Sequence, residues 1–529
     1  MSAIVTRPSF IRFSYPLRFD GSEFLERAAK IEQLRHSTDD GPVVVWKPLN
    51  PELRRTFGHF GEHINPKTRD DQTTALIWEL AEKPTSPEHG IWSDHDWALQ
   101  VKGRTVTQVK IQGAELFLFR TGIGFITLIA RPSWDTPLDD WLNVQHYFRF
   151  SNGHREVRLA AIQRDESGED HPYFPNFAGG LASTRDGKSG VARQLIDGLL
   201  VSKADILARN LWWTEPYLQG LLIPYAGLFI DHLPRSMVGE TLYRIRNVFQ
   251  PKQGLFPCDE DLSLEHPGLT PYAKDQWFLA SLDGAAFVAL DAPSKDEPGG
   301  EFSRNTLPSH LNGIYHLLFL VVHQQRLRLM DLSAAVASKW PVFEQNYPHG
   351  DPEGEFRKVR KDLMLFTARG LFSHIAPSEH HHCAYRRWQE IFEIDRLHRE
   401  VSDEINVMHQ FLEDQRRDQE DQRRYTERRL EEDHRKREER IEQDNRRVFE
   451  RTGLLIAVIA TIAVFPDLGL SLLNSRDVFG SSRSLTWAGA FLLLGFVILG
   501  ALHLMNRRRA SGEREQNGAV HEASNSGAR

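Results

Sequence analysis

Cysteine is scarce in this chain, which has only Cys258 and Cys383 among 529 residues. Two cysteines cannot build a disulfide framework, and such a low count is typical of proteins in a reducing compartment. The N-terminal segment also lacks the charged and then apolar pattern, with a small-residue cleavage site, that marks an export signal. We therefore expect the large N-terminal part of the chain to be cytoplasmic.

The chain also lacks a strong excess of charge of either sign. Its 65 Lys and Arg residues against 72 Asp and Glu residues give a formal net charge of -7. No domain-sized basic surface is evident, so nucleic acid is not an expected partner. The 40% of apolar residues suffice for one or two buried cores.

Catalytic motifs are missing as well. Residues 186–189 read Asp-Gly-Lys-Ser, like the end of a phosphate-binding loop, but Ala182 replaces the upstream glycine and no apolar strand precedes it. A surface turn is the better interpretation. The sequence thus predicts no enzyme, no catalytic residues and no residues that bind an organic cofactor.

One short tract contains potential metal ligands. His380, His382 and Cys383 lie together, and imidazole and thiolate groups are common ligands of metal ions. Adjacent side chains cannot all point at one ion, however. The alternative is a solvated loop before a helix, and the two interpretations stay open.

Two apolar runs near the C-terminus carry the strongest membrane signal. Residues 452–474 and 485–506 are each close to the roughly 20 residues that cross a bilayer, and they flank a short loop at 475–484. The small, polar tail at 507–529 is expected to be disordered. We expect a two-helix transmembrane hairpin; buried core helices of a soluble protein are the alternative.

Arginines set the expected orientation of this hairpin. Arg446, Arg447 and Arg451 precede the first run, and Arg507 and its two neighbours follow the second, whereas the loop between the runs has few cations. By the positive-inside rule both termini face the cytoplasm. The sequence therefore predicts a multi-pass protein of a bacterial inner membrane, with the lipid bilayer as a partner.

Asp467 is the acidic residue within the first apolar run. A carboxylate at membrane depth is costly and by default suggests a function, here a ring of acids at the mouth of a cation pore. Thr461 and Asn474 are further candidates for pore-lining residues. The alternative is that Asp467 ends the helix at the interface, where water tolerates the charge.

A long helix is expected at 385–451. Its first part has an apolar stripe, and residues 413–450 are almost wholly Arg, Glu, Asp and Gln with no Gly or Pro. Acids often precede bases by four residues, at about 0.2–0.5 kcal/mol for each pair. Apolar residues are too sparse for a tight zipper, so a wide coiled-coil bundle is expected, with a solvated helical spacer or a disordered charged linker as the alternatives.

The remaining N-terminal part, residues 1–380, reads as an α+β body in which helices cover a sheet. Residues 115–130 and 276–291 both read as strand hairpins, each followed by a helix. The body can thus consist of two similar halves, about 1–200 and 201–380, although a chance likeness of two hairpins explains the pattern equally well. The expected fold class is this α+β body, the stalk helix and the transmembrane hairpin.

This order of parts resembles the CorA family of divalent-cation channels. The resemblance implies a homopentamer, a pore lined by the first span, and magnesium or a related divalent ion as the permeant and gating species. The Gly-Met-Asn signature of that family is missing, and residues 465–467 read Phe-Pro-Asp in its place. No family residue is therefore carried over.

Two functions from different classes follow from these expectations. The first is a CorA-like oligomeric channel or transporter for metal cations, gated by the body through the stalk. The second is a membrane-anchored signalling or defence effector whose body senses a ligand or a protein and then perturbs the membrane. A passive scaffold is a third class.

Overall fold

The structure, a computed structural model, divides into two compact units, an N-terminal unit Met1–Asp414 and a C-terminal unit Gln415–Arg529. It describes residues 3–33, 46–48, 57–66, 69–70, 72–80, 96–101, 104–149, 157–164, 170–173, 222–248, 256–344, 352–372, 374–464, 499–500 and 503.

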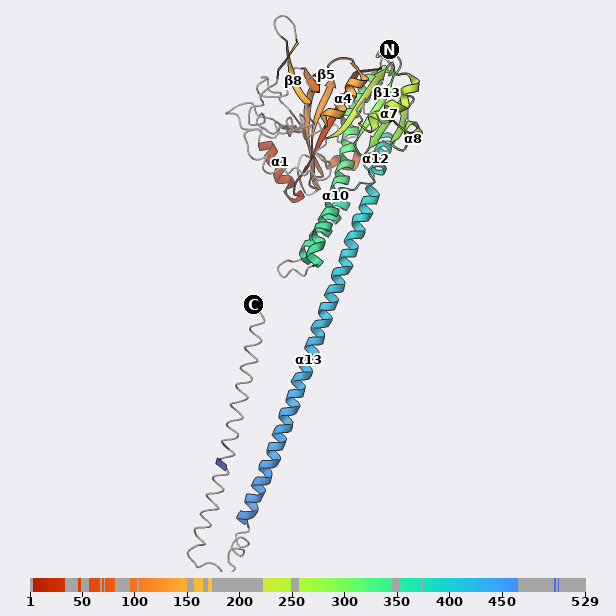
Figure 1. The fold of residues 1–529 in the computed structure, drawn as a ribbon. Helices are drawn as coiled ribbons and strands as arrows, with labels where there is room; N and C mark the ends of the chain where they lie inside the picture. Colours follow the sequence, from red (N-terminus) through yellow and green to blue (C-terminus); the bar gives the residue numbers. More distant parts are fainter. Residues whose placement is uncertain are drawn as a thin grey trace, which may run out of the picture. The chain divides into compact units, whose positions relative to one another are not determined.

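The N-terminal unit is built on one mixed sheet of 13 strands (Figure 1). Its main path runs β11-β12-β13-β10-β1-β6-β5-β4-β8-β9, with β3 on β5, β2 on β3 and β7 on β1. Paired strands are antiparallel except β10 and β13. The strands are β1 (Ile4–Arg18), β2 (Trp46–Pro48), β3 (Ala75–Leu80), β4 (Trp97–Val101), β5 (Arg104–Phe119), β6 (Ile123–Pro132), β7 (Thr136–Pro137), β8 (Val157–Arg164), β9 (Asp170–Tyr173), β10 (Ile223–Asp231), β11 (Leu269–Ala273), β12 (Gln276–Ser281) and β13 (Gly284–Leu290).

Helices cover both faces of this sheet. One apolar core includes residues of α1, α4 and α7, and a second includes residues of α3, of α9 to α12 and of the first turns of α13. The helical elements are η1 (Gly21–Glu23), α1 (Phe24–Gln33), α3 (Gly58–Glu62), α4 (Leu138–Phe148), η5 (Arg235–Met237), α7 (Val238–Arg246), α8 (Asp259–Leu262), the π-helical η6 (Phe302–Thr306), α9 (Leu307–His310), the π-helical η7 (Leu311–Tyr315), α10 (His316–Glu344), α11 (Pro352–Arg369), α12 (Glu379–Ile391) and α13 (Ile394–Val464).

The central strand β1 explains why both faces need covering. Side chains alternate between the two faces of a strand, and Ile11 and Phe13 enter the first core. Arg12 and Ser14 point to the other face, yet they are only 2% and 0% exposed. Polar residues in an alternating strand are thus buried here, because helices lie on both sides.

The two expected hairpins both form, and both belong to this one sheet. They are β5–β6 and β12–β13. Their surroundings differ, since β6 pairs with β1 in antiparallel fashion whereas β13 pairs with β10 in parallel. The strand next to the first hairpin is therefore antiparallel to it at β6, and the strand next to the second hairpin is parallel to it at β13.

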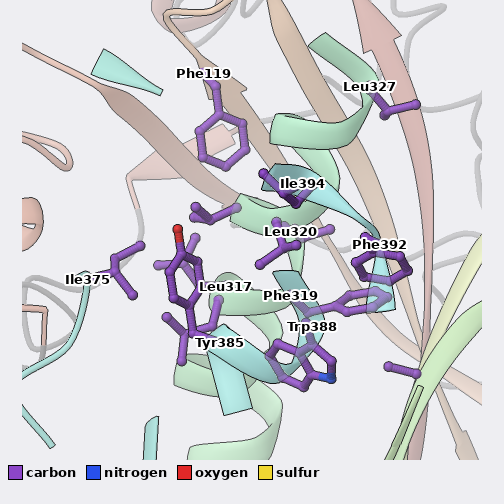
Figure 2. Close-up of a cluster of buried hydrophobic side chains, with 14 of the residues drawn as sticks. Phe119, Leu317, Phe319, Leu320, Leu327, Ile375, Tyr385, Trp388, Phe392 and Ile394 are labelled. Carbon is purple, nitrogen blue, oxygen red and sulfur yellow. The ribbon is translucent and has the colours of Figure 1, made fainter. Parts of the chain in front are cut away.

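The apolar stripe at the start of the long helix packs on α10. Figure 2 shows Trp388, Phe392 and Ile394 beside Phe319 and its neighbours on α10. All of these side chains are buried. The stripe that the sequence left without a partner therefore closes the second core.

The expected single helix from 385 is instead two helices. Helix α12 ends at Ile391 and α13 begins at Ile394, and Glu393 between them has a φ of 55°. In one continuous helix, residues two apart do not share a face. The break lets both Phe392 and Ile394, which are 1% and 0% exposed, enter the same core.

In the part of the chain that the structure describes, no helix is long and apolar enough to cross a membrane. Helix α13 ends at Val464, and its apolar end at 454–464 has about half of the roughly 20 residues that a span needs. This finding overturns the transmembrane hairpin at 452–474 and 485–506. The prediction of a multi-pass inner-membrane protein is wrong with it, whereas the lipid bilayer as a partner stays a prediction. Residues 465–498, which include the expected outer loop at 475–484, lie outside the described residues.

Candidate ligand site

The expected metal ligands lie in the first turns of α12 but do not converge. The ring of His380 lies 5.4 Å from that of Tyr272, and the ring of His382 lies 4.4 Å from that of His374. Cys383 is exposed. Among the described residues no three His, Cys, Asp or Glu side chains are grouped to hold a metal ion.

The expected pore residues cannot form a site in the described structure. Thr461 lies in the last turns of α13. Asp467 and Asn474 lie outside the described residues, as does the Asp-Gly-Lys-Ser turn at 186–189.

A pocket of about 870 Å³ opens in the N-terminal unit, in a region to which the sequence assigned no function. This volume is within the roughly 300–1,000 Å³ of small-molecule sites. Four segments far apart in the chain line the pocket: the end of β1 with the turn into η1, the β5–β6 turn, α10 and α11. The lining residues are Arg18, Phe19, Asp20, Gly21, Ser22, Arg120, Thr121, Arg328, Asp331, Leu332, Ala335, Glu355, Lys358, Val359, Lys361, Asp362, Leu365, Phe366 and Arg369.

Two turns with closely packed backbones form one wall of the pocket. The backbone N–H of Phe19 donates to the carbonyl of Gly122 over 2.8 Å. Gly122 has a φ of 90°, and a Cβ there would lie 2.6 Å from the carbonyl oxygen of Phe19. Only glycine tolerates both this positive φ and this close approach of the backbone without strain.

Asp20 holds the turn from β1 into η1. Its Oδ1 accepts hydrogen bonds from the backbone N–H of Ser22, at 2.9 Å, and from the Ser22 hydroxyl, at 2.8 Å. These bonds lower the pKa of the Asp20 carboxyl, and the positive charges of Lys358 and Arg328 lower it further. Asp20 is thus ionised at neutral pH and already bound.

A chain of ion pairs joins the other walls. The buried carboxylate of Asp331 lies 2.8 Å from Arg18 Nη2 and 2.8 Å from Arg328 Nη1. Arg328 Nη2 also lies 3.1 Å from Asp362 of α11. One arginine of α10 therefore connects α11, through Asp331, to the end of β1.

The balance of charge in the pocket is positive. Six lining side chains are cationic and four are acidic. Three of the acids, Asp20, Asp331 and Asp362, accept the bonds described above. By contrast, Lys361 and Arg369 form no ion pair with any carboxylate in the described part of the chain. The side chains that remain available to a ligand are thus mainly cations of α11.

The same helices that line the pocket also hold the first turns of α13. Thr367 Oγ1 lies 3.0 Å from Nε2 of His398, and Ser333 Oγ donates to Glu404 Oε2 over 3.2 Å. Thr367 lies on α11 next to Phe366, which lines the pocket. A ligand bound between α10 and α11 would therefore contact residues on the same two helices that hold α13.

A second polar cluster is closed to solvent. Arg12 donates to both carboxylate oxygens of Glu115, at 2.5 and 3.0 Å, and to Nδ1 of His316 at 3.1 Å. Because Nδ1 accepts, the ring proton lies on Nε2, which is 3.4 Å from Ser14 Oγ. Burial, and then the charge of Arg12, hold the pKa of His316 well below its usual range. These groups satisfy one another, so we interpret the cluster as structural.

Sequence reasoning missed the pocket because its lining comes from residues about 18 to 369. The one local signal is the Lys-Val-Arg-Lys run at 358–361 with Arg369 beyond it. Such a run usually marks a solvated helix face, and nothing in it indicates the turns on the opposite wall.

Comparison of the chain with family models, with curated proteins and with solved structures finds no match. The resemblance to the CorA family thus rests on the order of parts alone and stays a prediction.

Proposed function

We propose that this chain is a ligand-responsive regulatory protein rather than an enzyme. A small molecule binds in the pocket of the N-terminal unit, and binding changes how the first turns of α13 are held. The observation that carries this proposal is that α10 and α11 line the pocket and also contact α13.

The coupling rests on contacts at three points along α13. They are the Thr367–His398 and Ser333–Glu404 bonds and the stacked rings of Phe356 and His409, whose centroids are 6.2 Å apart. A ligand that binds one arrangement of α10 and α11 more tightly shifts the protein towards that arrangement. The contacts with α13 then change as well, because they are made by the same helices.

Helix α13 is the element that we propose responds to ligand binding. It is continuous from Ile394 to Val464, so its backbone leads from the N-terminal unit into the C-terminal unit. Beyond residue 415 its described side chains are almost all exposed. Exposed apolar side chains occur among the charges, at Tyr425, Leu430, Ile441, Val448 and Phe449.

We further propose that these residues serve assembly with other copies of the chain. The apolar positions are too sparse for a tight zipper, which favours a wide bundle. Mass determination of the full-length chain in solution tests this part, and a monomer at all concentrations would contradict it. The divalent-cation channel is not proposed, since it requires the transmembrane hairpin.

A test of the coupling does not require knowledge of the ligand. In a Cys258→Ser/Cys383→Ser background, Leu365→Cys places a thiol in the pocket, where Leu365 is 40% exposed. A bulky maleimide on this thiol fills the pocket. We expect changed amide hydrogen exchange at residues 394–412, because α11 must shift.

Met364→Cys is the matched control. Met364 is the preceding residue, is 66% exposed and does not line the pocket. The label at 364 should leave exchange at 394–412 as it is in the unlabelled protein. If the labels at 364 and 365 have the same effect, or if neither has any, the coupling proposal is wrong.

A further inference from the structure

We propose that the ligand of this pocket is an oligophosphate, a nucleotide or an inorganic polyphosphate with two or more phosphate groups. This inference rests on the proposed function, because it takes the pocket to be a ligand site. It names the chemistry that the pocket selects.

The first argument is the state of the charged groups. Asp331 and Asp362 are neutralised by Arg18 and Arg328, and Asp20 is bound by Ser22. Among the described residues, neither Lys361 nor Arg369 has such a carboxylate partner. An incoming anion therefore meets unpaired positive charges and no free carboxylate among these three acids.

The second argument is the spacing of the cations along α11. At about 1.5 Å per residue, Lys358 and Arg369 are about 16 Å apart along the helix axis, and Lys361 lies between them. A single inorganic phosphate is too small to reach both ends of this row. A chain of phosphates, or phosphates joined to a nucleoside, can contact several of these cations at once.

The third argument is that two arginines are already held in place. Asp331 pairs with Arg18 and Arg328, which line the pocket together with Lys361. A guanidinium has five N–H donors, so Asp331 does not use all the donors of Arg18, and Asp331 with Asp362 does not use all those of Arg328. Fixed donors reduce the entropy that phosphate binding costs.

Apolar side chains complete the lining. Phe19, Leu332, Val359, Leu365 and Phe366 lie among the charged residues. Small-molecule sites commonly combine such apolar walls with a few polar groups. They can accept a nucleoside, and comparison of a nucleotide with a bare polyphosphate shows whether they do.

Calorimetric titration of the full-length chain tests the inference with three probes: ATP, inorganic triphosphate and adenosine, without added metal. We expect ATP, triphosphate or both to bind, with an affinity that falls as salt is raised because screening weakens charge contacts. Adenosine should bind at least about tenfold more weakly, since it lacks the charged hydrogen-bonding groups.

The decisive variant is Lys361→Gln/Arg369→Gln, which should weaken phosphate binding by about tenfold or more. Arg360→Gln is the control, because Arg360 is exposed on α11 and does not line the pocket. The control should stay within about twofold of the wild type. Tighter binding of ATP than of triphosphate identifies a nucleotide, and the reverse identifies a polyphosphate.

Failure of both phosphate probes to bind the wild type overturns the inference. Equal binding by the double variant and the wild type, or equal binding of adenosine and ATP, does so too. The maleimide experiment then still decides the coupling by itself. Conversely, phosphate binding with unchanged exchange at 394–412 supports the ligand and contradicts the coupling.

Discussion

Charged residues have opposite surroundings in the two units. In the N-terminal unit, the side chain of Arg12 is 2% exposed and that of its partner Glu115 is 11% exposed. In the C-terminal unit, Arg435 and Glu439 also pair, but their side chains are 71% and 61% exposed. Both are Arg–Glu ion pairs, yet they differ in how far the free energy of unfolding would fall if the pair were lost.

The difference is due to desolvation. A buried charge has given up its water, so removal of its partner leaves a large uncompensated penalty. An exposed charge keeps its water, so an exposed pair contributes only a few tenths of a kcal/mol. Stability of the first unit therefore depends on few specific contacts, and that of α13 beyond 415 depends on many weak ones.

The largest effect is expected from the buried pair. Glu115→Gln leaves the Arg12 guanidinium buried without a counter-charge, and we expect a loss of about 3–5 kcal/mol of unfolding free energy. Urea unfolding followed by tryptophan fluorescence measures it. Arg12→Met/Glu115→Leu, which removes both charges, should recover much of the loss. A single variant within about 1 kcal/mol of wild type would mean that this pair behaves like an exposed one.

Acid should affect the N-terminal unit more than α13. Burial, together with His310 and His380, lowers the pKa of His381 to about 4, whereas an unfolded histidine titrates near 6.5. Between these values the unfolded chain binds a proton that the folded unit does not, so stability falls as pH falls from about 6.5 to 4. We expect about 1–3 kcal/mol from this group.

Urea midpoints at pH 7 and pH 4.5 measure this dependence. His381→Phe removes the titrating group and should reduce the difference between the two midpoints. His323, whose pKa burial lowers to about 3, should maintain some pH dependence in that variant. An unchanged difference in His381→Phe would contradict the assignment.

Two threonine hydroxyl groups allow a contact between helices to be compared with a contact inside one helix. Thr367 reaches His398 of α13, whereas the hydroxyl of Thr426 bonds only carbonyls of its own helix, at Gln422 and Arg423. Thr367→Val should destabilise the first turns of α13 by about 1 kcal/mol. Hydrogen exchange at 394–412 should increase about fivefold, and Thr426→Val should leave it unchanged. Equal effects of the two substitutions would show that the Thr367 contact does not hold α13.

The smallest effect is expected on the exposed surface of α13. Arg435→Ala removes one pair with Glu439 and should cost about 0.2–0.5 kcal/mol. Circular dichroism of the full chain during urea titration is the measurement. A loss above 1 kcal/mol would indicate that Arg435 is buried in an assembly, and the mass of the variant would then differ from that of the wild type.

Local patterns predicted the elements that depend on neighbouring residues. The hairpin turns and the helix at α4 follow from periods and turn residues that a short window contains. The long charged helix follows from acids and bases four residues apart. In contrast, the transmembrane hairpin was inferred from the length of two apolar runs and from the arginines that flank them, and the described helices do not support it.

Several features depend on contacts between distant residues, so no local pattern indicates them. Arg12 and Ser14 alternate with apolar residues, which usually indicates a solvated face, but α10 covers that face and buries them. The break between α12 and α13 arises because Phe392 and Ile394 both pack on α10.

The sequence alone determined where the chain forms hairpins and where it forms one long charged helix, because those depend on spacing over a few residues. Only the tertiary structure decided which charges are buried and which line the pocket. Both follow from the order of the strands and from which helices pack on which face, and these bring together residues as distant as Arg18 and Arg369. A charged residue has the same letter in the sequence whether it is buried or exposed. Its contribution to stability depends on how much water its neighbours exclude from it.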